Sequence, residues 1–139
     1  MVSRVLVPVD GSEMAERALR YALEVHDDAE ITVMHVVGEP SPMFGVATGL
    51  AVADDIREAA DEHAREVLEA SEAVAAEYDR SVETLVEVGH PAKAILAEAP
   101  DHDLIVIGSH GGKLADRLFV GNVAERVFRR SPVPVTTIR

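Results

Sequence analysis

The feature that most constrains the fold is an alternation of two hydrophobic patterns along the chain. Short apolar runs rich in β-branched residues predict strands near residues 5–9, 31–37, 82–88, 104–107 and 133–138. Between them, apolar residues recur three or four positions apart near residues 13–26, 51–78, 91–99 and 120–128, which predicts amphipathic helices. Strands connected by helices pair in parallel, with helices covering both faces of the sheet. The pattern therefore predicts a doubly wound α/β fold around a five-stranded parallel sheet.

The chain length fits a single domain spanning residues 1–139, and a hydrophobic content of 47% supplies a core of ordinary size. The segment from Gly38 to about Leu50 holds three glycines and two prolines, so we expect an irregular, mobile loop there.

The net charge is −12, from 25 acidic and 13 basic residues. Such a charge repels phosphate backbones and anionic lipid, which argues against nucleic acid or a membrane as a partner. Only Lys93 and Lys113 are lysines. Acid enrichment with few lysines is typical of halophilic proteins, and an ordinary acidic bacterial or archaeal protein is the alternative.

The chain has no cysteine, which fits a reducing compartment, and no apolar run approaches the length of a membrane span. We therefore expect a cytoplasmic protein.

In a doubly wound sheet, ligands bind beyond the carboxyl ends of the strands where the winding reverses direction. The ends of the first and fourth predicted strands, at Asp10 and Gly108, are thus the places to look for a site.

A glycine-rich loop follows the fourth strand, with Gly108, Gly111 and Gly112 before Gly121 and Asn122 at the start of the last helix. Glycines let the backbone approach a phosphate closely, and a helix N-terminus presents unpaired N–H groups. The loop favours an anionic ligand. It matches neither the Walker A pattern nor the dinucleotide G-x-G-x-x-G pattern.

Charge supports the same segment, because residues 108–130 carry five basic and two acidic residues, a net +3 that leaves −15 elsewhere. Lys113 and Arg117 are candidate phosphate ligands. Arg126, Arg129 and Arg130 are assigned to the C-terminal end of the helix, where cations offset the macrodipole.

The chain resembles the universal stress protein (UspA-like) family over essentially its whole length. The resemblance rests on residues 5–12, on His35-Val36 and on residues 108–127. The ATP-binding branch carries G-x2-G-x9-G-[ST], and Gly108, Gly111 and Gly121 stand at its glycine positions, with Asn122 in place of Ser or Thr. The resemblance implies an adenine nucleotide alpha hydrolase-like sheet of strand order 3-2-1-4-5, and homodimers formed through the last strand, residues 133–138.

The resemblance also implies a binding site for ATP or another adenine nucleotide. Pro8, Asp10 and Val36 would line the adenine and ribose pocket. Ile107, Gly108 and Gly111 would follow the ribose and phosphates, and Gly121, Asn122 and Val123 would close on the phosphate tail. A Mg²⁺ or Mn²⁺ ion could arrive with the phosphates and bind Asp10.

Several of these residues also have a structural interpretation. Asp10 could cap the first helix, with Glu13 three residues later in a capping-box pattern, and Asn122 could cap the last helix. His26 and His63 fall on apolar helix faces, while His90 and His102 lie in predicted turns. No histidine pair has the i, i+4 spacing of a helical zinc site.

The sequence shows no nucleophile elbow, paired catalytic carboxylates or kinase signature. It therefore favours a small nucleotide-binding stress-response regulator over an enzyme. A non-nucleotide-binding dimeric scaffold or chaperone-like protein, which Asn122 favours, and a slow ATP hydrolase are the alternatives.

Overall fold

The structure is a computed structural model that describes residues 1–38, 42–109 and 122–139, with the backbone alone for residues 42–54. Its strands are β1 (Arg4–Pro8), β2 (Glu30–Val37), β3 (Glu83–Val88), β4 (Leu104–Gly108) and β5 (Val135–Ile138). Its helices are α1 (Glu13–Val25), α2 (Pro42–Glu77), α3 (Pro91–Glu98), the 3-10 helix η1 (Ala99–Asp101) and α4 (Asn122–Arg130).

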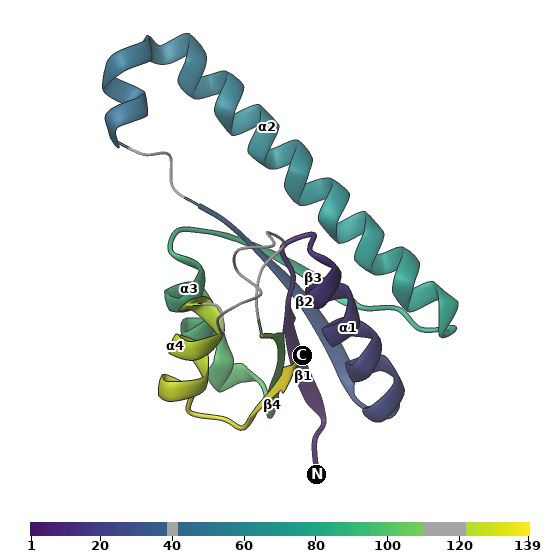
Figure 1. Cartoon of the computed structure of the whole chain (residues 1–139). Coiled ribbons are helices and arrows are strands. Elements are labelled where there is room, and N and C mark those ends of the chain that lie inside the picture. Colours follow the sequence, from purple (N-terminus) through teal and green to yellow (C-terminus); the bar gives the residue numbers. More distant parts are fainter. Residues whose placement is uncertain (39–41, 110–121) are drawn as a thin grey trace.

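The strands form one parallel sheet in the order β3-β2-β1-β4-β5. Helices α1 and α2 lie on one face of the sheet and α3 and α4 on the other (Figure 1). The predicted doubly wound α/β fold and its strand order are confirmed.

Alternate residues of each central strand enter different cores. Val5 and Val7 of β1 pack with α1 and α2, whereas Leu6 between them packs with α3 and α4. Val106 and Ile105 of β4 divide in the same way. Because successive strand side chains point to opposite faces, an uninterrupted apolar run builds both layers at once.

Two expectations from the sequence were wrong. The predicted loop from Gly38 to Leu50 is helical from residue 42, because α2 begins at Pro42. Proline is tolerated in the first helical turn, where its missing N–H has no intrahelical partner, so it starts this helix instead of breaking it.

The second error concerns the expectation that helices cover both faces of the sheet, which fails at β3. Its residues are exposed except for the half-buried Leu85, and Val86 and Val88 are 45% and 68% exposed. The strand lies at the sheet edge, where α2 packs against β2. Glu83 and Glu87 place charges on this edge strand, as is common at the edges of sheets.

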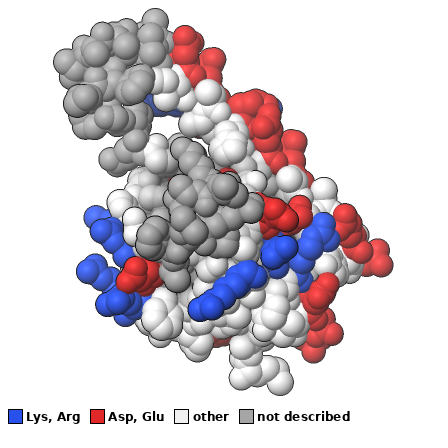
Figure 2. Space-filling view, in the orientation of Figure 1, with Lys and Arg blue, Asp and Glu red and all other residues white. Residues whose placement is uncertain are grey.

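Acidic side chains are concentrated on one helix. Figure 2 shows them along α2, while basic side chains lie over α3 and α4 and in a band across the α1 side of the molecule. None of the helices in the described part of the chain combines the length and apolar character needed to cross a membrane.

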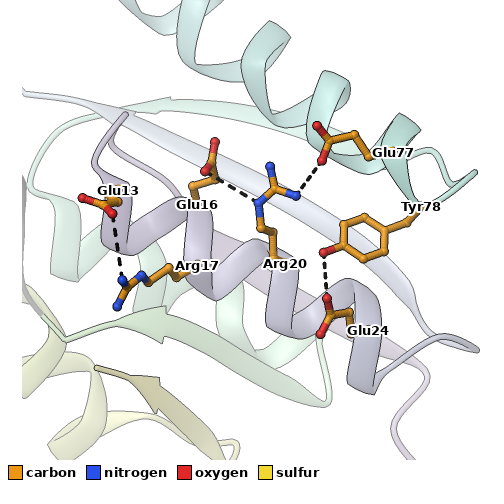
Figure 3. A network of polar contacts seen from close by, with 7 residues as sticks. All are labelled: Glu13, Glu16, Arg17, Arg20, Glu24, Glu77 and Tyr78. Carbon is orange, nitrogen blue, oxygen red and sulfur yellow. Dashed lines mark hydrogen bonds and ion pairs between the residues drawn. The ribbon is translucent and has the colours of Figure 1, made fainter.

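Polar side chains join the C-terminal end of α2 to α1 (Figure 3). Arg20 Nη1 donates to Glu77 Oε2 at 2.5 Å, and its Nε lies 3.6 Å from Glu16 Oε2. The Tyr78 hydroxyl donates to Glu24 Oε1 at 2.8 Å. Because these groups are solvent-exposed, they contribute little to the free energy of unfolding. Their main effect is to fix the orientation of the two helices.

A stronger contact comes from Arg80, just after α2, which is half-buried. Its Nη1 donates to the carbonyl oxygens of Leu23 (3.0 Å) and His26 (3.2 Å), and its Nη2 donates to that of Ala29. These carbonyls lie at and just beyond the C-terminal end of α1, which has no basic residue in its last turn. The guanidinium therefore supplies the missing cation.

We predict that Arg80→Ala lowers the free energy of unfolding by about 2 kcal/mol, because three carbonyls lose a charged donor. Arg65→Ala is the matched control, since Arg65 is exposed and its ion pair among the described residues is with Glu62, one turn away in α2. It should change stability by less than about 0.5 kcal/mol. Urea unfolding of the two variants measures the difference, and equal effects would refute the role of Arg80.

Candidate functional site

A cavity of about 310 Å³ opens at the carboxyl ends of the central strands. The cavity results from the unequal pairing of β1 with its two neighbours. Strand β1 pairs with β2 as far as Pro8 and Met34. With β4, β1 pairs only at Val5 and Leu6. Pro8 has no N–H to donate to a ladder, so β1 and β4 diverge at the switch point that the fold places there.

The structure brings together the predicted site residues that it describes. Seven of them line this cavity: Pro8, Asp10, Val36, Ile107, Gly108, Asn122 and Val123. They come from the ends of β1, β2 and β4 and from the start of α4. Gly111, Lys113, Arg117 and Gly121 lie outside the described residues.

Helix α3 contributes a wall that was not predicted from the sequence, through Pro91 and Ile95. The signal was available, because Gly89-His90-Pro91 follows the third strand at the same edge of the sheet. The other lining residues not predicted are Val9, Ser12, Ala15, Met34 and Ala124.

Asp10 does not cap α1, which corrects the capping interpretation. Ser12 is the N-cap, and its Oγ accepts the Ala15 N–H at 3.2 Å. Asp10 Oδ1 instead accepts the Ser12 N–H at 2.9 Å, and Gly11 between them has a φ of +83°. This turn fixes one oxygen of the exposed carboxylate and leaves Oδ2 without a partner among the described residues.

Two histidines support this turn from the α2 side. The buried His35 donates from Nδ1 to the Val9 carbonyl at 2.9 Å, and its ring meets that of His63 edge to face at 5.6 Å between centroids. His63 also lies beside Gly11, where a Cβ atom would come 3.5 Å from its Cε1. The end of β1 is therefore held between β2 and α2.

Asn122 is the first residue of α4, so it stands inside the helix and not at the cap position before it. Of the three arginines assigned to the C-terminal end of α4, Arg129 and Arg130 lie in its last turn. Arg126 lies before the last turn, and its Nη1 is 3.3 Å from Nε2 of His90, the residue that precedes α3.

The cavity can hold a flat apolar group beside a polar one. Pro8, Met34, Val36, Ile95 and Ile107 form apolar walls, and Asp10 is the only charged residue among the described lining residues. A carboxylate there suits hydroxyl donors, while the N-terminus of α4 presents N–H groups to an anion. Among the described residues, no cluster of three or more acidic or histidine side chains could hold a metal ion by itself.

Gly108 allows β4 to approach α1 closely. A Cβ atom at this position would lie 2.8 Å from Met14 Cγ and 3.1 Å from the Met14 carbonyl carbon and oxygen. Two of these three atoms belong to the backbone, which cannot rotate away. The glycine thus has a packing role besides its place in the loop.

We predict that Gly108→Ala destabilises the protein by about 2 kcal/mol, because α1 must shift away from β4. Gly38→Ala is the control, since a Cβ atom there meets nothing within 4 Å. That change should be neutral or slightly stabilising. Thermal unfolding compares the two, and a Gly108→Ala protein as stable as the parent would contradict the packing argument.

The sequence and fold agree with known proteins. The universal stress protein family model matches residues 1–139. Universal stress protein YxiE of Bacillus subtilis is 31% identical, and the alignment covers 100% of both chains. The chain belongs to the universal stress protein family.

Solved structures show the same architecture. Universal stress protein UspA from Lactobacillus plantarum superposes with a TM-score of 0.82 at 27% identity, covering 99% of this chain and 98% of that one. A universal stress protein from Archaeoglobus fulgidus, solved in complex with dAMP, gives a TM-score of 0.67 at 27% identity and covers 100% and 98%.

Proposed function

We propose that this universal stress protein binds an adenine nucleotide in the cavity between β1 and β4 and acts as a stress-response regulator. One observation carries the proposal: seven residues assigned to nucleotide contact from the sequence converge on one cavity. The Archaeoglobus fulgidus relative in complex with dAMP supports the same ligand class.

The chemistry of the walls suggests how each part of the ligand would be held. The base would lie between Pro8, Val36 and Ile107, and Asp10 Oδ2 would accept a ribose hydroxyl. The phosphates would lie toward the N-terminus of α4, with Gly111, Gly121, Lys113 and Arg117 as further contacts expected from the sequence. A Mg²⁺ or Mn²⁺ ion would bind chiefly through the phosphates, with Asp10 as the protein ligand.

Binding is tested by calorimetry and thermal shift with ATP, ADP, AMP and adenosine. We expect Asp10→Ala to weaken binding about tenfold, the worth of one hydrogen bond to a charged group. Asp28→Ala removes an equally exposed carboxylate beyond α1 and should have no effect. Absence of binding by all four ligands would leave the scaffold function, and phosphate release from bound ATP would indicate slow hydrolysis.

We also propose that the protein is a homodimer formed through residues 133–138. Strand β5 is at the sheet edge and pairs only with β4 in the described structure. Helix α4 packs beside β5. Its Phe128 is an apolar residue that is 66% exposed. An open edge and an exposed aromatic ring so close together favour pairing with a second copy.

Phe128→Glu is therefore expected to raise the dimer dissociation constant at least about tenfold, because a buried carboxylate would face the partner. Val25→Glu is the matched control, since Val25 is an exposed apolar residue like Phe128 but lies at the C-terminal end of α1, on the opposite face of the sheet from α4. Sedimentation equilibrium over a range of concentrations measures both. A parent protein with monomeric mass throughout would overturn the proposal.

The charge pattern supports a high-salt cytoplasm as the working environment. Acidic side chains crowd the visible surface of α2 (Figure 2), and such repulsion is tolerable where the Debye length is about 3 Å, at molar salt.

A further inference from the structure

His102 is a buried histidine for which the proposed function has no use. Its side chain is 1% exposed, and neither Nδ1 nor Nε2 has a hydrogen-bond partner among the described residues. Buried polar atoms are rarely left in this state. The sequence placed His102 in a turn and did not indicate its burial.

Four charged groups lie near this ring. Glu98, at the end of α3, has Oε1 3.4 Å from Nε2 but outside hydrogen-bonding geometry. Asp101 of η1 and Asp103 before β4 are its exposed neighbours in the chain, and Arg4 of β1 adds a positive charge. The carboxylates of Asp101 and Asp103 thus lie at the surface, where an imidazolium leaving the core would meet them.

Burial, reinforced by Arg4, lowers the pKa of His102 below the usual value for histidine, and the three carboxylates only partly oppose this. A lowered pKa means that the open form, with the ring in water, binds the proton more tightly than the closed form. The closed form, with the ring buried, is therefore fully favoured above about pH 6.5. Its stability relative to the open form decreases as the pH falls below that value.

The segment that contains His102 connects two walls of the cavity. Pro91 and Ile95 of α3 line it on one side, and Ile107 and Gly108 of β4 line it on the other. His102 ends η1, which joins these elements, and its own N–H donates to the Ala99 carbonyl at 3.0 Å. Moving the ring outward would open η1 and release the end of α3.

We propose that His102 is a proton-sensitive latch: when it is protonated, the ring leaves the core, η1 opens and the α3 wall of the cavity loosens, which weakens nucleotide binding. The effect on affinity rests on the proposed function, whereas the opening of η1 does not. Acidification would thus release the ligand, and bound ligand would resist protonation of His102.

The first experiment needs no nucleotide. Hydrogen exchange, corrected for intrinsic rates, is measured at pH 7.5 and 5.5 for the amides of His102 and Asp103, which donate to Ala99 and Arg4. We expect protection to fall at least about fivefold at the lower pH in the parent, because one proton can change the opening equilibrium up to tenfold per pH unit. His102→Leu should lose this dependence while keeping an apolar core.

His102→Gln serves as a second variant that cannot titrate, should the leucine variant fold poorly. His26→Gln is the control, because His26 is a half-buried histidine at the end of α1, remote from η1 in the sequence. It should retain the pH dependence of the parent. If the exchange protection of these amides in the parent is the same at the two pH values, the proposed role of His102 is wrong.

The second experiment measures AMP affinity of the parent and of His102→Leu over the same pH range. The ratio of their dissociation constants cancels the titration of the phosphate, whose second pKa is near 6. We expect the ratio of the parent's dissociation constant to that of His102→Leu to be at least about threefold higher at pH 5.5 than at pH 7.5. This change is within what the binding of one proton can produce. A constant ratio would overturn the coupling to the cavity, and no AMP binding at any pH would count against the proposed function, with the exchange result standing separately.

Discussion

The divergence of β1 from β4 is the constraint on which the candidate site depends. The two strands pair at only two residues of β1, Val5 and Leu6, and Pro8 supplies no donor to continue the ladder. Helix α1, which follows β1, and helix α4, which follows β4, pack on opposite faces of the sheet, and this leaves a gap between the two strand ends. The cavity is thus a consequence of topology, and side chains at the strand ends decide only what can occupy it.

The remainder of the α1 and α2 layer keeps the end of β1 in place. Arg80 binds the carbonyls at the far end of α1, and Arg20 and Tyr78 join α1 to the end of α2 (Figure 3). At the other end, His35 and His63 hold the Asp10 turn. Helix α1 is therefore fixed at both termini, and the Asp10 carboxylate sits on a rigid support, which a binding site needs for orientation.

Periodicity was sufficient to predict the doubly wound parallel sheet and to place a site at the ends of its first and fourth strands. The strand order and most of the individual cavity residues came from the resemblance to the family. The sequence was insufficient where contacts between distant segments decide which residue caps a helix or where a helix begins. Asp10 and Ser12 both suit an N-cap, and only the position of the turn shows that Ser12 takes that role. Pro42 reads equally well as a loop residue or as the first residue of a helix.

Burial of a polar residue is harder still to predict. His102 follows Pro100 and Asp101, a pattern typical of an exposed turn, yet it packs in the core. Likewise, Val86 and Val88 read as core residues and are exposed, because an edge strand has a neighbour on one side only. In both cases the number of neighbouring elements, which the local sequence does not encode, determines exposure.

The net charge of −12 and a phosphate-bearing ligand are compatible once distance is considered. Long-range repulsion decays within about 8 Å at physiological ionic strength and within about 3 Å at molar salt. Inside the cavity the nearest groups determine the affinity for a ligand. Among the described residues these groups are the apolar walls, one carboxylate and the N-terminus of α4. If an adenine nucleotide binds there as proposed, the affinity for its base and ribose would be nearly independent of salt, whereas the contribution of its phosphates would depend on how strongly salt screens the acidic surface. High salt would weaken the repulsion of the phosphates without weakening the apolar contacts, so the acidic surface would reduce the affinity of such a site little at molar salt.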